Sequence, residues 1–257
     1  MSLIVDDGAV LINNNELSVY GVYLSSDGIS VGEAELSTAF VDVPARWGAY
    51  DLSATDTTGR AVAGRREITL NVAATVEPDT RADVAEMDMA QARREIGALH
   101  GAECTVTDIR QGLTWTGRMS VGEWVDVYDA GQVLAHATCE LKLTADPCAI
   151  SDTCSVAVNG ATSVLYGGNV VSAPIVQLVP TSAGQVAFSI NGITWSATVS
   201  STSTVYVDCG RAWAHLADNS AVVPNLIADW PCLVPGENAF TVTNCTLTVT
   251  YDERVMV

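Results

Sequence analysis

Alternating apolar and polar positions dominate this sequence, and one stretch departs from that alternation. Between residues 80 and 101 the apolar side chains recur at intervals of three and four, at Ala85, Met89, Ala92, Ile96 and Leu99. This spacing gathers them on one face of an α-helix and fits no strand. The sequence therefore predicts one amphipathic helix, over residues 80–100, in a chain that otherwise forms strands.

Both ends of this helix carry sequence signals. Pro78 comes just before it, and Asp79 or Thr80 can accept a hydrogen bond from the first free backbone amides. Asp83 adds negative charge in the first turn, where the helix dipole favours it. Gly101 suits the left-handed conformation that ends many helices.

Short β-prone runs lie on both sides of the helix. The turn signal Asp27–Gly28 follows the first run, residues 46–64 have the composition of a loop, and Val121–Gly122 is one of several glycine turns after the helix. The runs after the helix, with their glycine turns, predict an antiparallel meander. The expected strands are residues 18–25, 41–43, 68–75, 104–109, 113–119, 123–128 and 134–143.

The strand expected at residues 134–143 has two different faces. Cys139, Leu141 and Leu143 alternate with polar residues and point toward a core. His136 falls on the polar face, which favours a solvated surface histidine over a ligand or a base.

Seven more strands are expected in the second half, where no helix interrupts them. Asn159–Gly160 and Asn191–Gly192 predict hairpin turns, because both residue types tolerate a positive φ. After the second turn, Trp195 returns along the partner of a strand whose core face carries Val186, Phe188 and Ile190. This pattern predicts a β-sandwich. The strands are residues 155–158, 162–165, 174–179, 185–190, 194–199, 204–208 and 245–251.

A domain boundary is expected at Asp146–Pro147. Proline ends strand pairing, and the composition changes there from charged to rich in Ser, Thr, Val and Asn. The fold class is therefore mainly β, with an α+β first domain at residues 1–147 that is built like a barrel or sandwich and carries the helix. An antiparallel β-sandwich follows at residues 148–257.

The charge balance is strongly acidic, with a formal net charge of −18. Before Pro147 there are 23 acidic and 10 basic residues, and from Pro147 onward there are 7 acidic and 2 basic residues. DNA is itself a dense polyanion, so direct DNA binding is disfavoured. The same surplus of acidic residues also keeps a protein soluble. Composition alone does not distinguish a role in solubility from a role in repelling nucleic acid.

Composition excludes several other classes of protein. Hydrophobic residues make up 48% of the chain and charged residues only 16%, which disfavours disorder. There is no run of about 18 apolar residues, and MSLIVDDGAV lacks the basic start of a secretory signal. We therefore expect neither a membrane span nor a secretory leader.

No residue pattern predicts catalysis, a cofactor or a metal site. The motifs GxSxG, HExxH and the P-loop are absent, and VDVYD at residues 125–129 lacks the ligand spacing of a calcium loop. Without a CxxC pair, the seven cysteines are expected to be reduced and mostly buried. Three scattered histidines suggest no site, and the six tryptophans are expected mainly in cores. These residues are Cys104, Cys139, Cys148, Cys154, Cys209, Cys232 and Cys245; His100, His136 and His215; and Trp47, Trp115, Trp124, Trp195, Trp213 and Trp230.

Three segments, in order, resemble the distal tail proteins of phages with long, flexible, non-contractile tails. They are TTGRAVAGRREITLNV at residues 57–72 ahead of the helix, VLAHATCELKLTADPC at residues 133–148, and YGGNVVSAPIVQLVPTSAGQVAFSINGITW at residues 166–195. In that family the third pattern opens a galectin-like sandwich. The resemblance implies a ring-forming first domain at residues 1–147 and a galectin-like domain at residues 148–257.

The resemblance also implies a function without catalysis. Distal tail proteins form a homo-hexameric ring that joins the tail tube protein to the tail-tip hub or baseplate of the virion. DNA passes through the ring without specific binding, and an acidic channel wall would suit that passage. Such a protein would be made in the host cytoplasm, with no membrane partner.

Two alternatives remain open. A cell-surface or tail-fibre carbohydrate-binding adhesin would have the same β-rich pattern, and a tail tube subunit would stack into long tubes. The sugar site of galectins uses a His-x-Asn-x-Arg strand, whereas His215 is followed here by Leu216-Ala217-Asp218-Asn219. Sugar binding of that kind is therefore disfavoured.

Overall fold

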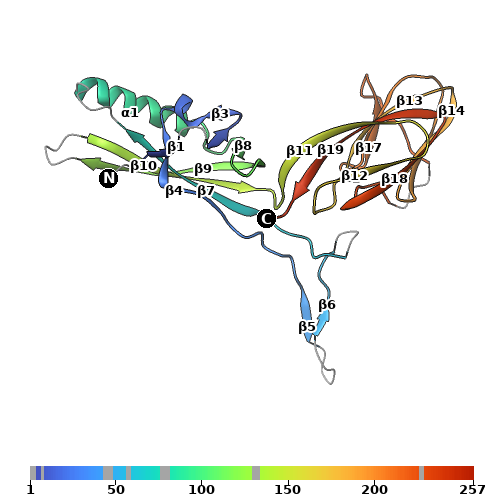
Figure 1. Cartoon of the computed structure of the whole chain (residues 1–257), viewed down its shortest axis with the longest axis horizontal. Helices are drawn as coiled ribbons and strands as arrows, with labels where there is room; N and C mark the ends of the chain where they lie inside the picture. The colour runs from blue at the N-terminus through green and yellow to red at the C-terminus, as the bar shows by residue number, and fades with distance from the viewer. Residues whose placement is uncertain are drawn as a thin grey trace. The chain divides into compact units, whose positions relative to one another are not determined.

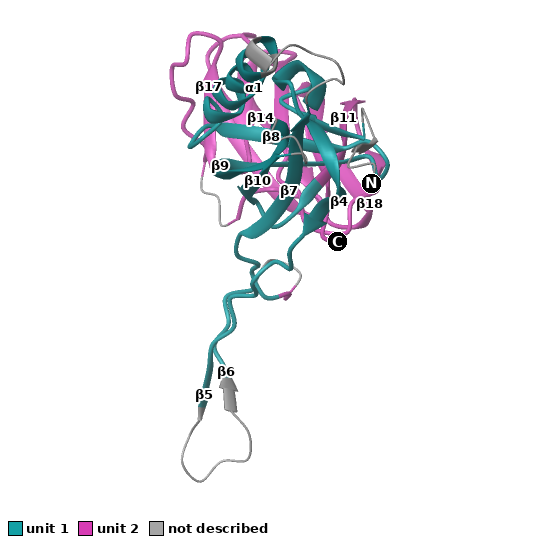
Figure 2. Ribbon diagram, turned by 90° about the vertical axis from the view of Figure 1, so that its left-hand side faces the viewer, with its two compact units in different colours: residues 1–55, 61–149 teal, residues 56–60, 150–257 magenta. Residues whose placement is uncertain are grey.

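The computed structural model describes residues 4–6, 9–42, 49–55, 59–75, 82–128, 134–225 and 229–257. It divides into two compact units, which we call unit 1 (residues 1–55 and 61–149) and unit 2 (residues 56–60 and 150–257) (Figures 1 and 2). The expectation of a mainly β chain is confirmed, and α1 is the one α-helix of the described part.

Unit 1 is built on an antiparallel sheet with the strand order β1-β4-β7-β10-β9. Strand β8 pairs with β9, β2 with β8 and β3 with β2, while β5 and β6 form a separate pair. The elements are β1 (Ile4–Asp6), β2 (Val10–Ile12), β3 (Asn15–Glu16), the 3₁₀-helix η1 (Leu17–Tyr20), β4 (Tyr23–Val31), β5 (Phe40–Asp42), β6 (Ala49–Asp51), β7 (Arg66–Thr75), α1 (Ala82–Gly97), β8 (Glu103–Asp108), β9 (Leu113–Tyr128) and β10 (Leu134–Ala145).

Helix α1 lies across one face of this sheet and packs on β7 and β10 (Figure 1). Its stripe Met89, Ala92 and Ile96 is buried, as is Leu99 in the turn after the helix. Gly101 has a φ of 76° and ends this turn, as expected. The helix ends at Gly97, three residues before the expected end at residue 100, and its expected cap at Asp79 or Thr80 lies outside the described residues.

The strand predicted at residues 18–25 is wrong in its first half. Residues Leu17–Tyr20 form η1, because Gly21 has a φ of 71° and lets the chain fold back. The amides of Gly21 and Val22 then donate to the carbonyls of Ser18 and Leu17. Asp27–Gly28 is also not a turn between strands: it lies inside β4, where the pairing with β7 shifts register.

The turn predicted at Val121–Gly122 is likewise a bulge. Strand β9 continues through it for 16 residues, and the register with β10 shifts between Cys139 and Leu141. A Cβ on Gly122 would lie 2.9 Å from the carbonyl oxygen of Glu140, so glycine permits the close approach of the strands. The two strands expected at 113–119 and 123–128 are therefore one.

Unit 2 is a β-sandwich, as predicted. One sheet has the order β11-β19-β13-β16-β17 and the other β12-β18-β14-β15. The elements are β11 (Ala149–Val158), β12 (Thr162–Tyr166), β13 (Ile175–Pro180), β14 (Gly184–Ile190), β15 (Ile193–Val199), β16 (Val205–Asp208), β17 (Trp213–Leu216), β18 (Gly236–Thr243) and β19 (Cys245–Val255).

Both sheets contribute to one core in unit 2. Phe188 of β14 and Trp195 of β15 stack with ring centroids 5.6 Å apart, and β13 adds Val176 and Leu178 from the other sheet. Asn191 has a φ of 52° and Gly192 a φ of 86°, which confirms the predicted hairpin between β14 and β15.

The YGGN stretch at residues 166–169 holds the end of β19. The hydroxyl of Tyr166 donates to the carbonyl of Val170 at 2.6 Å and accepts from the amide of Arg254 at 3.0 Å. A Cβ on Gly168 would overlap that hydroxyl. Asn169 then exchanges two hydrogen bonds with the backbone of Met256, so the motif fixes the last residues of unit 2.

Candidate functional surfaces

A thin two-stranded arm leaves the sheet of unit 1 and carries β5 and β6 (Figures 1 and 2). Backbone hydrogen bonds join its two sides, from Ser37 to Val62 at 2.8 Å and from Leu52 to Ala39 at 2.7 Å. The amide of Gly64 also donates to the carbonyl of Glu35. Part of the loop expected at residues 46–64 is therefore paired.

The arm has no core of its own. None of its described side chains in residues 32–41, 51–55 and 59–65 is buried. Large apolar side chains are nevertheless frequent there: Leu36 is 57% exposed, Phe40 63% and Leu52 63%, and Val41 and Val62 are exposed as well. An isolated two-stranded hairpin is only marginally stable in water, and a cluster of exposed apolar side chains usually marks a contact surface.

A second surface is the sheet face of unit 1 that points away from α1. Register places residues of neighbouring strands side by side on this face, such as Glu67 with Thr144 and Asn71 with Glu140. Here the alternation predicted for β10 is confirmed, because Cys139, Leu141 and Leu143 are buried on the opposite face. We call this surface the threonine face. Its members are Glu67, Thr69, Asn71, Glu103, Thr105, Thr107, Thr114, Thr116, Arg118, Ser120, Thr138, Glu140, Lys142 and Thr144.

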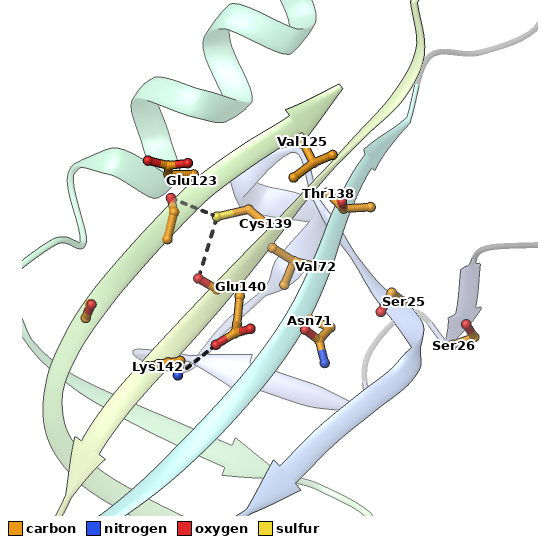
Figure 3. Close-up of a pocket in the computed structure, with 12 residues that line it drawn as sticks. Ser25, Ser26, Asn71, Val72, Glu123, Val125, Thr138, Cys139, Glu140 and Lys142 are labelled. Carbon is orange, nitrogen blue, oxygen red and sulfur yellow. Dashed lines mark hydrogen bonds and ion pairs between the residues drawn. The ribbon is translucent and has the colours of Figure 1, made fainter. Parts of the chain in front are cut away.

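An open hollow of about 470 Å³ lies on the threonine face (Figure 3). The ammonium group of Lys142 stands between two carboxylates at its edge, 3.1 Å from Oε1 of Glu67 and 3.0 Å from Oε1 of Glu140. These two carboxylates raise the pKa of Lys142, Glu140 contributing most. Cys139 lies deeper, and its thiol donates to the carbonyls of Gly122 and Glu140 (Figure 3).

The three histidines lie in separate places. His100 follows α1, and its Nδ1 accepts a hydrogen bond from the amide of Val121 at 3.1 Å. His136 lies on the outer face of β10, as predicted, although it is half-buried and not fully solvated. His215 lies in unit 2, where its ring stacks on those of Trp213 and Tyr206, with centroids 4.1 and 5.4 Å away.

The tryptophans and cysteines are mainly structural. Trp115 and Trp195 are fully buried, and Trp124 lies under the guanidinium of Arg93. Trp213 is exposed at 40%, while Trp47 lies outside the described residues. None of the seven cysteines, all within the described residues, forms a disulfide, and five of them are buried. Within the described residues, no cluster of three or more His, Cys, Asp or Glu could hold a metal ion.

The described residues also include no helix with the length and apolar character needed to cross a membrane. Searches by sequence give no match, either to a protein-family model or to a curated protein. A solved structure does match. The crystal structure of the SPP1 Dit (gp 19.1) protein aligns over 96% of this chain and 98% of its own, with a TM-score of 0.68 and 16% sequence identity.

This chain has the fold of the SPP1 Dit protein. The Dit fold extends over both units, because the alignment leaves only a small part of either chain uncovered. Two structures of the activated phage P2 baseplate, with Ca and with Sr, align over 91% of this chain and 92% of theirs at 7% identity. Their TM-scores of 0.33 and 0.34 are too low to support a conclusion.

The sequence did not predict the arm as a surface. Its one signal was a series of apolar residues, Leu36, Phe40, Leu52 and Val62, around a stretch with loop composition. From the sequence, the threonine face could be predicted only along β10, because its other rows depend on the register between strands.

Proposed function

We propose that this chain is a structural protein of a phage virion, and that it forms a homo-hexameric ring at the distal end of a long, non-contractile tail. The ring joins the tail tube protein to the tail-tip hub. The observation that carries this proposal is the Dit fold over nearly the whole chain, since the matched SPP1 protein is described as a paradigm of the hub adsorption apparatus in phages that infect Gram-positive bacteria.

In this proposal, contacts between copies run head to tail around the ring, so each copy uses two different patches. The arm is one of them. Its side chains Leu36, Phe40 and Leu52 are exposed in the single chain, and a neighbouring copy would remove them from water. Unit 1 is then the ring-forming domain, and unit 2 corresponds to the galectin-like domain of distal tail proteins.

The acid surplus suits a passage for DNA. Most of the net charge of −18 belongs to the first half of the chain, which would surround the passage. Within about 8 Å of a wall at physiological salt, its field is still felt by a passing phosphate backbone. Acidic walls therefore let DNA pass without binding, and the chain acts without catalysis or a cofactor.

Light scattering and negative-stain imaging of the purified protein test this proposal. We expect single rings of six copies with a central hole. A monomer that binds glycans on an array would instead support the adhesin alternative, and long stacked tubes would support a tail tube subunit. A stable monomer at high concentration would overturn the proposal.

A matched pair of variants tests the role of the arm. Phe40→Ser combined with Leu52→Ser removes two exposed apolar side chains from the arm, and we expect the rings to dissociate while the circular dichroism spectrum is unchanged. Leu165→Ser removes a side chain of β12 that is 71% exposed in unit 2, and it should leave the rings intact. Rings that survive the arm variant would contradict this role.

A further inference from the structure

The threonine face is an open sheet surface whose rows are mainly polar, and register adds the exposed Val125 and Val127 at the end of β9. Helix α1 covers the opposite face, and most residues in the rows of the threonine face are Thr, Ser, Asn, Glu, Lys or Arg. Pairs of neighbouring polar groups satisfy one another, as in the hydrogen bond of 2.9 Å between the hydroxyls of Thr107 and Thr114. The face therefore has its own polar network and remains open to water.

Such a face does not suit burial between two proteins. Stable interfaces depend on a few buried aromatic or aliphatic anchors, with polar groups mainly at the rim. The members of the threonine face include no aromatic or large aliphatic anchor, and its two exposed valines, Val125 and Val127, lie at the end of β9. The arm has the opposite character, with Phe40 and Leu52 exposed. In an assembly built from these two surfaces, the arm is the one that becomes covered and the threonine face is the one left in water.

The charges on this face are unusual as well. Lys142 is the only lysine in the sequence, and it stands between the carboxylates of Glu67 and Glu140. The other cation of the face, Arg118, uses its Nη1 to donate to the carbonyl of Gly101 at 3.0 Å. With three carboxylates against two basic groups, the face carries a small net negative charge, and its lysine is compensated on two sides.

We propose that the threonine face lines the DNA passage of the ring, and that Glu67 and Glu140 prevent Lys142 from binding passing phosphates. This inference rests on the proposed function and names the residues of the wall. Duplex DNA binds proteins mainly through lysine and arginine contacts to its phosphates, with counterion release. A ring repeats one lysine in each copy. Two carboxylates beside each lysine remove the attraction that such a ring of cations would otherwise exert on DNA.

Removing the two carboxylates tests this role. The variant Glu67→Gln with Glu140→Gln keeps side-chain size and leaves Lys142 uncompensated. We expect its rings to bind a short DNA duplex at least tenfold more tightly than wild-type rings at about 50 mM salt, and to lose that binding at about 300 mM. Adding Lys142→Gln should abolish the gain. Glu86→Gln with Glu95→Gln makes the same charge change on the exposed side of α1, and should give no gain.

Because the sequence has a single lysine, chemical acetylation of lysine measures the accessibility of Lys142 directly. An amine-reactive acetylating reagent should modify Lys142 in wild-type rings, as measured by mass spectrometry of the peptide that contains it. In the double variant, added duplex should protect Lys142 from acetylation, whereas in the α1 control it should not.

The outcomes separate the two proposals. If purified protein forms no ring, the proposed function fails. If rings form but Lys142 resists acetylation, or if the double variant binds DNA no better than the α1 control, the assignment of the threonine face is wrong and the ring remains.

Discussion

Cys209 follows β16, and its thiol is packed into the core of unit 2. Burial raises the pKa of this thiol to about 12, and the nearby Asp208 and Cys232 add to the shift. Its ordinary value in an unfolded chain is 9.0. The protonated thiol therefore packs as a small apolar group, and the folded state of unit 2 favours this protonated form.

This pKa difference predicts how stability responds to alkali. Above pH 9 the unfolded chain loses the Cys209 proton while the folded chain keeps it, so the free energy of unfolding falls as pH rises toward 12. The slope from one such group approaches about 1.4 kcal/mol per pH unit. Urea unfolding between pH 9 and 11 measures it.

Cys209→Ala is the comparison that isolates this effect. The variant lacks the titrating group, so the fall of its unfolding free energy over the same pH range should be smaller than in the wild type. Identical slopes for the two proteins would show that Cys209 does not titrate differently in the folded state.

At the scale of elements, α1 shows how a periodic pattern fixes a structure. Its apolar stripe reaches the sheet through Ile96, which is fully buried, while Met87 on the other side of the same helix is 70% exposed. Both residues have good to moderate helix propensity. What separates them is contact with β7 and β10, the strands on which α1 packs.

We predict that Ile96→Ala destabilises unit 1 by about 2–5 kcal/mol, because it leaves a cavity between α1 and the sheet. Met87→Ala should change stability by less than about 0.5 kcal/mol. Calorimetry measures both, and the transition of unit 2 serves as an internal reference. Equal losses for the two variants would contradict the packing described for α1.

The sequence predicted those elements whose periodicity was uninterrupted. Helix α1 and strands β7, β10 and β14 were expected within a few residues of their observed bounds, because each buries a regular apolar series. Glycine was the main source of error. Gly28 and Gly122 mark bulges inside long strands, and their local signal is the same as that of a turn, so only the pairing partner decides between the two.

Two strands of unit 2 were missed. In β18 the first core position is Asn238, a fully buried polar residue, so the apolar alternation is interrupted there. Its side chain accepts from the amide of Val234 and donates to the carbonyls of Val234 and Gly236. Strand β17 has only four residues, and three of them are not fully buried. Its apolar alternation is therefore too short to predict a strand. Strand β18 is held by long-range pairing with β12 and β14, which leaves no periodic signal, whereas β17 pairs locally with β16.

At the scale of the whole molecule, net charge bears on the proposed assembly. Each copy carries −18, so copies in a ring repel one another over roughly the 8 Å that physiological salt allows. The contact that opposes this repulsion is apolar in our proposal, through the arm. Salt screens the repulsion and leaves apolar burial unaffected or strengthened.

Assembly should therefore strengthen with ionic strength. We predict that the fraction of protein in rings rises between about 20 mM and about 300 mM sodium chloride, because the Debye length falls over that range. Sedimentation velocity at several salt concentrations measures the fraction. If rings dissociate as salt rises, ion pairs rather than apolar contacts hold the copies together.

The exposure of the arm side chains also affects how the sequences of such proteins diverge. No described side chain of residues 32–41, 51–55 or 61–65 is buried in its own subunit. Substitutions there leave the two cores untouched, and in our proposal they act mainly on the contacts between copies. If the proposal holds, related phages that grow in one cell keep their assemblies separate through differences in the arm alone, while the rest of each protein keeps its shape.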